Sequence, residues 1–137
     1  TGRKIICGGT TAAIISRELN LPIKVNLKEI RNGGEIPPTA DMPGFDLVSE
    51  GTITLSRALR GLEEDARIDE MPDNAVKRLM RILIDSDIIE FVVGTKINDA
   101  HQDPALPKDL EIRRNLMKQM SKVLEHKYLK STKILFV

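Results

Sequence analysis

Hydrophobic and polar positions along the chain follow two periods, which predict strands and helices in turn. Short apolar runs predict strands over residues 3–7, 23–27, 46–49, 88–93 and 132–137. Apolar residues spaced three to four positions apart predict helices over residues 10–19, 52–64, 72–85 and 108–128. Strands that alternate with helices are typical of a parallel sheet covered on both faces. We therefore expect an α/β fold: a three-layer, Rossmann-like domain with a mostly parallel sheet of about five strands.

The helical periodicity also selects the side chains expected in the core. They are Ile14, Ile15 and Leu19 in the first helix; Leu55, Ala58, Leu59 and Leu62 in the second; Val76, Leu79, Met80 and Leu83 in the third; and Ile112, Leu116, Met120, Val123 and Leu124 in the last.

The connection over residues 28–45 has no clear helix and is rich in glycine and proline. Connections of this length in a compact domain are lids, binding loops or disordered segments. We favour an ordered segment that crosses the domain and is anchored by Ile36 and Met42, with disorder as the alternative.

Composition excludes several classes of protein. The chain has 137 residues and a net charge of +1, and only 3% of its residues are aromatic, which argues against a nucleic-acid partner. No apolar run approaches the roughly 20 residues that span a bilayer, and no signal peptide is visible, so no membrane partner is expected. The single cysteine excludes an internal disulfide and fits a reducing cytoplasm, where we expect the protein.

We expect residues 1–137 to form one α/β domain. The chain begins at Thr1, directly before a predicted strand. This position favours a segment taken from a longer polypeptide.

Two strands are followed at once by a glycine–threonine turn and a helix. The first turn consists of Cys7, Gly8, Gly9, Thr10 and Thr11, and the second of Glu50, Gly51 and Thr52. Such turns point the N–H groups of a helix N-terminus at the solvent, where they can hold an anion. The simpler interpretation is that the glycines turn the chain and that Thr10 or Thr11 caps the helix.

A third loop follows the strand over 88–93 and supplies Gly94, Thr95, Lys96, Asn98 and His101. All three loops lie at the carboxyl ends of predicted strands, where open parallel sheets bind their ligands. We therefore expect these residues to bind a small anionic ligand such as a phosphate or carboxylate. Whether the three loops form one pocket stays open, and neither turn matches a known nucleotide-binding motif.

Catalysis by these residues is an alternative. A helix N-terminus can activate Cys7 as a nucleophile, and Glu50 or His101 can act as a base. A buried, inert Cys7 and a Glu50 that caps its helix are the competing interpretations. The chain has neither a pair of histidines at zinc spacing nor a carboxylate cluster, so we assign no catalytic residue and no metal ligand.

Four segments together resemble a known family. They are Lys4–Ala12, Ile36–Pro38, Phe45–Leu55 and Val93–Pro104, and they resemble the region after the catalytic domain in some bacterial serine phosphatases of the stage II sporulation E family. That family belongs to the metal-dependent type 2C-like class. The resemblance covers nearly the whole chain and implies a C-terminal accessory domain with a phosphatase domain upstream as its partner.

The resemblance places the catalytic metals elsewhere. In that family, aspartates of Asp-Gly motifs in the preceding domain bind two Mn²⁺ or Mg²⁺ ions. This chain has no Asp-Gly dipeptide, so no cofactor is expected within it. We expect a regulatory or ligand-sensing domain; the alternatives are an independent enzyme that uses Cys7, Glu50 and His101, and a protein-interaction module that forms a homodimer.

Overall fold

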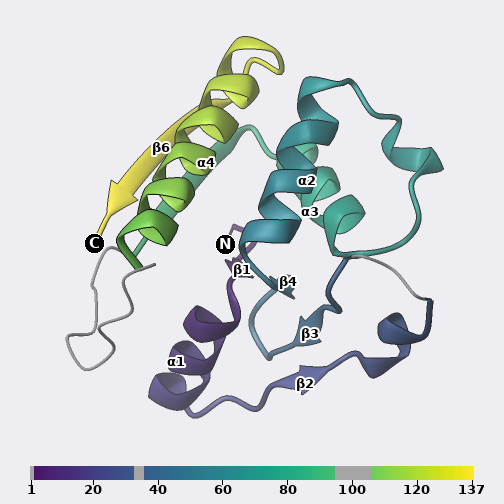
Figure 1. Cartoon of the computed structure of the whole chain (residues 1–137), viewed down its shortest axis with the longest axis vertical. Coiled ribbons are helices and arrows are strands. Elements are labelled where there is room, and N and C mark those ends of the chain that lie inside the picture. Colours follow the sequence, from purple (N-terminus) through teal and green to yellow (C-terminus); the bar gives the residue numbers. More distant parts are fainter. Residues whose placement is uncertain (1, 33–35, 95–105) are drawn as a thin grey trace. The chain divides into compact units, whose positions relative to one another are not determined.

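The computed structural model describes residues 2–32, 36–94 and 106–137 (Figure 1). The chain divides into two compact units, Thr1–Leu83 and Ile84–Val137, and each is described by itself. Their helices and strands are, in order, β1 (Ile5–Cys7), α1 (Gly9–Leu19), β2 (Lys24–Val25), a 3-10 helix (Leu27–Asn32), β3 (Ala40–Asp41), β4 (Leu47–Ser49), α2 (Thr52–Glu63), a second 3-10 helix (Ile68–Glu70), α3 (Ala75–Asp85), β5 (Ile88–Val93), α4 (Leu106–His126) and β6 (Ser131–Phe136). The α/β class expected from the sequence is confirmed.

The sheet of the first unit has four strands in the order β1-β4-β3-β2. Strands β1 and β4 are parallel, whereas β3 pairs antiparallel with both β4 and β2. The expected sheet of about five mostly parallel strands is therefore not what the structure contains: this sheet is mixed, and β5 and β6 form a separate parallel pair. The reason lies in residues 28–45, whose described part forms a 3-10 helix and β3 and no α-helical crossover of the kind that returns a chain parallel to itself.

The second and third helices bury the side chains that periodicity selects for them. All four residues selected in α2 and all four in α3 are buried, and Ala58 and Leu62 are fully enclosed. In α1 the prediction holds only for Ile15, which is partly buried against the core. It is wrong for Ile14 and Leu19, which are 46% and 58% exposed while the smaller Ala12 is buried. Ile14 lies about 200° around the helix from Ala12, so the two cannot face the same sheet.

The crossing segment is ordered over its described part. Met42 is buried with Ile6 and Val48, as expected for an anchor, and Ile36 is half-buried. Its polar counterpart is Thr39, which is only 1% exposed.

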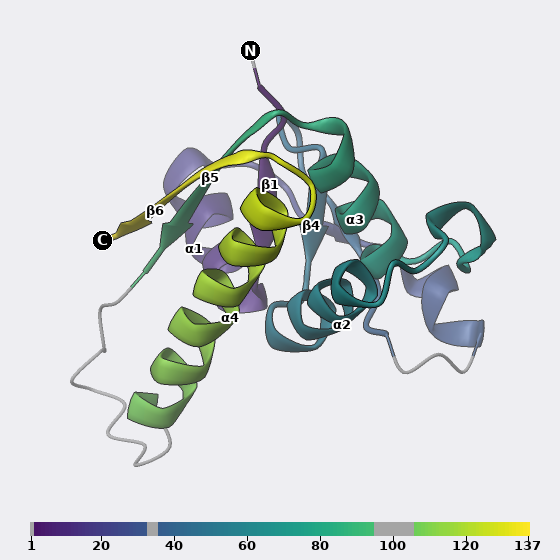
Figure 2. The ribbon, with the colours of Figure 1, turned by 90° about the horizontal axis from the view of Figure 1, so that it is seen from above.

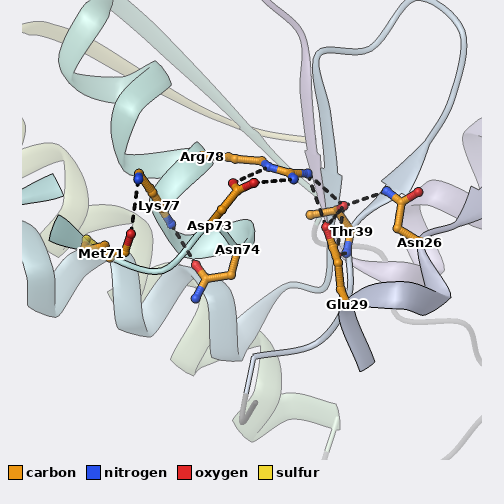
Figure 3. Close-up of polar contacts among 8 residues, drawn as sticks. All are labelled: Asn26, Glu29, Thr39, Met71, Asp73, Asn74, Lys77 and Arg78. Atoms are coloured by element: carbon orange, nitrogen blue, oxygen red, sulfur yellow. Dashed lines mark hydrogen bonds and ion pairs between the residues drawn. The ribbon is translucent and has the colours of Figure 1, made fainter. Parts of the chain in front are cut away.

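Thr39 is the centre of a polar network that joins this segment to α3 (Figure 3). Its backbone N–H donates to Glu29 Oε2 at 2.5 Å, and its hydroxyl donates to Glu29 Oε1 at 2.9 Å. The same hydroxyl oxygen accepts hydrogen bonds from Asn26 Nδ2 at 2.8 Å and from a guanidinium nitrogen of Arg78 at 3.2 Å. Arg78 also pairs with Asp73 at 3.1 Å and lowers the pKa of that carboxyl. The network adds side-chain hydrogen bonds to the short strand pairings that β3 makes with β2 and β4.

The second unit is a parallel strand pair packed on one helix. Strands β5 and β6 pair from Ile88 with Ser131 to Val93 with Phe136. Thr132 contacts Ser121 and Glu125 of α4, which places α4 against the face that carries Thr132.

Within α4 the predicted core is only partly right. Met120 and Leu124 are fully buried, but Ile112 is 48% exposed. Met117, which was not selected, is buried instead. No helix in the described ranges has the length and apolar character needed to cross a bilayer.

Candidate functional site

The first two glycine–threonine turns lie together in the first unit. Because β1 and β4 are parallel neighbours, with Cys7 opposite Ser49, their carboxyl ends meet at one edge of the sheet (Figure 2). A Cβ atom added to Gly51 would lie 3.4 Å from the Cys7 carbonyl oxygen and 3.5 Å from Gly8 Cα. The two turns are thus in backbone contact, and the N-termini of α1 and α2 start from the same place.

Gly8 sets the geometry of the first turn. It has φ 144° and ψ 125°, a conformation that is open to glycine and strained for any L-residue. Its N–H donates to the Ser49 carbonyl at 2.8 Å, and its own carbonyl accepts the first helical hydrogen bond, from Ala12 N–H at 2.9 Å. The turn is therefore fixed to β4 on one side and to α1 on the other.

The N-terminus of α1 has no side-chain cap. Gly8 occupies the N-cap position, so the expectation that Thr10 or Thr11 caps the helix is wrong: both lie within its first turn. Gly9, Thr10 and Thr11 are exposed, and in the part of the chain that the structure describes their backbone N–H groups have no acceptor. These three donors lie at the positive end of the helix dipole, where negative charge is favoured.

The N-terminus of α2 is capped by the side chain of Glu50, the residue just before its glycine. Glu50 Oε2 accepts hydrogen bonds from the N–H groups of Ile53 at 3.0 Å and Thr54 at 3.4 Å. Glu50 therefore caps α2, the simpler of the two roles considered for it, and Gly51 and Thr52 follow it at the start of the helix. The N-terminus of α2 is therefore capped by the Glu50 carboxylate, whereas the adjacent N-terminus of α1 has no side-chain cap.

Cys7 is the last residue of β1 and directly precedes Gly8 of the first turn. Burial raises the pKa of its thiol, a contact with the Ser49 hydroxyl lowers it, and the negative charge of Glu50 raises it again; the net shift is upward. A raised pKa keeps the group a neutral thiol at physiological pH, and the thiol is a much poorer nucleophile than the thiolate. The environment of Cys7 thus opposes a nucleophilic role.

We predict slow alkylation of Cys7 for this reason. At about pH 7.5, iodoacetamide should modify the folded protein at least about tenfold more slowly than free cysteine, because the raised pKa moves the thiolate to more alkaline pH. Mass spectrometry of timed aliquots measures the rate, and the urea-unfolded chain is the control for intrinsic reactivity. A folded-state rate equal to that of free cysteine would show an activated thiol and return Cys7 to the list of catalytic candidates.

Of the third predicted loop, the structure describes only the first residue. Gly94 follows β5 in the second unit and is exposed. Thr95, Lys96, Asn98 and His101 lie outside the described residues.

Two features of the first unit were not anticipated. Thr54, in the first turn of α2, is fully buried and its hydroxyl oxygen has no hydrogen-bond partner among the described residues. The network of Glu29, Thr39 and Arg78 joins residues far apart in sequence, so no local pattern signals it.

The described residues contain no group of three or more His, Cys, Asp and Glu side chains that could hold a metal ion. Comparison of the chain with models of known protein families, with curated proteins and with solved structures finds no match. Geometry is therefore the basis for a functional proposal.

Proposed function

We propose that this chain is a regulatory or ligand-sensing accessory domain that binds a small anion at the N-terminus of α1. The observation that carries the proposal is the uncapped first turn of α1, where the N–H groups of Gly9, Thr10 and Thr11 are exposed beside the N-terminus of α2. Unsatisfied N–H groups and the helix dipole both favour negative charge at this position.

Glu50 restricts what the site accepts. Its carboxylate accepts a hydrogen bond from the first turn of α2, and its negative charge raises the pKa of Cys7. That charge therefore also acts on any ligand bound at the first glycine–threonine turn. A second anion beside it experiences like-charge repulsion, which is smallest for a ligand of low charge. The proposed ligand class is therefore a small carboxylate or a singly charged phosphoryl group, with the hydroxyls of Thr10 and Thr11 as additional donors.

The parent protein is the second part of the proposal. The motifs that resemble the stage II sporulation E family support an upstream serine/threonine phosphatase domain as the partner, with Mn²⁺ or Mg²⁺ bound in that domain and the whole protein in the cytoplasm. In this arrangement, anion binding reports a metabolite to the phosphatase.

A thermal-shift screen tests the ligand-binding part. Phosphate, sugar phosphates, nucleotides and organic acids are compared at millimolar concentration, where a preformed site stabilises the folded state by mass action. Gly9→Pro removes one of the three N–H donors at a position where proline is tolerated, and Gly9→Ala keeps that donor. We expect one class of anion to raise the Tm of the wild type and of Gly9→Ala, and to have a smaller effect on Gly9→Pro. A shift of equal size in all three proteins would place the anion elsewhere.

A further inference from the structure

The pair of strands β5 and β6 has one face that α4 does not cover. Side chains alternate between the faces of a strand, and Thr132 marks the face that contacts α4. The opposite face, called here the open face, consists of Ile88, Glu90 and Val92 from β5 and Ser131, Lys133 and Leu135 from β6.

The open face has three apolar residues, one acid and one base at its centre, and a serine at one end. Ile88 is 80% exposed and Val92 is 64% exposed, whereas Leu135 is half-buried. Glu90 lies directly opposite Lys133 in the strand register, and neither forms an ion pair with another described residue. Parallel strands in proteins are almost always covered on both faces, so this surface is suited to a partner.

We propose that the open face binds the open face of a second copy of this chain. Its charges are self-complementary: the face is neutral, so it attracts neither an acidic nor a basic partner, but it carries both members of an ion pair in register. A two-fold axis that runs parallel to the strands, midway between β5 and β6, places each Glu90 over Lys133 of the second copy. The same axis places Val92 over Leu135 of the second copy, so apolar side chains meet as well.

Strand dimensions limit the strength of this dimer. The two strands give a face about 20 Å long and about 10 Å wide, or about 200 Å² per copy, well below the roughly 800 Å² per partner of a standard interface. The dimer is therefore transient, with a Kd of about 10–100 µM. It forms through the second unit and does not depend on the anion-binding site.

Charge exchange tests the proposal in the full 137-residue chain. Sedimentation velocity is measured from about 5 µM to about 500 µM, on both sides of the expected Kd. Glu90→Lys and Lys133→Glu should each weaken self-association at least about tenfold, because each brings like charges together across the axis. The double exchange should restore it, and an equimolar mixture of the two single variants should form a heterodimer, because their charges are again complementary.

Circular dichroism first confirms that each variant is folded, since like charges opposite each other on neighbouring strands also destabilise the monomer. Val92→Asn is the second kind of variant: it removes an apolar contact without changing any charge, and it should also weaken the dimer. A wild type that stays monomeric at about 500 µM, far above the expected Kd, would overturn the proposal. Self-association that neither the charge exchanges nor Val92→Asn changes would also overturn it, by placing the contact on another surface.

Discussion

Gly8→Ala is expected to destabilise the protein by about 2–3 kcal/mol, while Gly9→Ala one position later is expected to be neutral or slightly stabilising. Gly8 has φ 144°, which an alanine adopts only with strain, whereas its added Cβ would make only an ordinary contact with the Thr11 hydroxyl at 3.5 Å, so the cost comes from the backbone. Gly9 lies within α1, and a Cβ there meets no atom within 4 Å. Alanine is favoured over glycine in a helix by up to about 1 kcal/mol, so the two substitutions should have opposite effects.

Urea denaturation of the two variants measures this difference directly. The comparison is well controlled, because the variants add the same methyl group to neighbouring residues. Equal stability of the two proteins would show that the backbone of Gly8 relaxes without cost. The geometry assigned to the first turn would then be wrong.

Thr39→Val is expected to destabilise the protein by about 2 kcal/mol. Valine has nearly the shape of threonine, so the substitution removes the hydroxyl without opening a cavity. Asn26 and Arg78 each lose an acceptor, and Glu29 loses a donor in a partly buried position. Polar groups that lose their partners on burial account for the cost.

Thr39→Ser is the matched control, because it keeps the hydroxyl and removes only a methyl group. It should cost about 1 kcal/mol or less, by loss of that buried group. Urea denaturation monitored by circular dichroism gives both values. If the serine variant were the less stable of the two, packing of the methyl group and not the polar network would hold the crossing segment.

The elements predicted best from the sequence are those whose structure depends on local pattern. In α2 and α3, a strong helical period coincides with burial, and all the predicted side chains from Leu55 to Leu83 are inside. In α1 the period was present but misleading: Ile14 and Leu19 are large and apolar yet exposed, because the small Ala12 faces the sheet. Hydrophobicity alone does not show which of two apolar faces a short helix buries.

Features that depend on distant residues were not predictable in the same way. The antiparallel course of β3 is fixed by its pairing with β2 and β4 and is reinforced by Thr39, whose partner Arg78 is 39 residues away in sequence. At the site, the sequence placed both glycine–threonine turns at the carboxyl ends of strands, and the contact between them is added by the structure. The sequence did not show that the two helix ends differ, with Glu50 on α2 and no cap on α1, because that difference depends on side-chain hydrogen bonds.

Titration of the ¹⁵N-labelled protein with inorganic phosphate tests the central claim most directly. Amide chemical shifts report on each N–H group separately, and the open N-terminus of α1 predicts saturable shifts at Gly9, Thr10 and Thr11. The amides of Ile53 and Thr54 already donate hydrogen bonds to Glu50, so they should shift little. We expect saturable shifts at the amides of Gly9, Thr10 and Thr11. In Gly9→Pro the shifts at Thr10 and Thr11 should be lost, and in Gly9→Ala they should be kept. Absence of any saturable change at those amides up to millimolar phosphate, acetate and sugar phosphate would contradict the account.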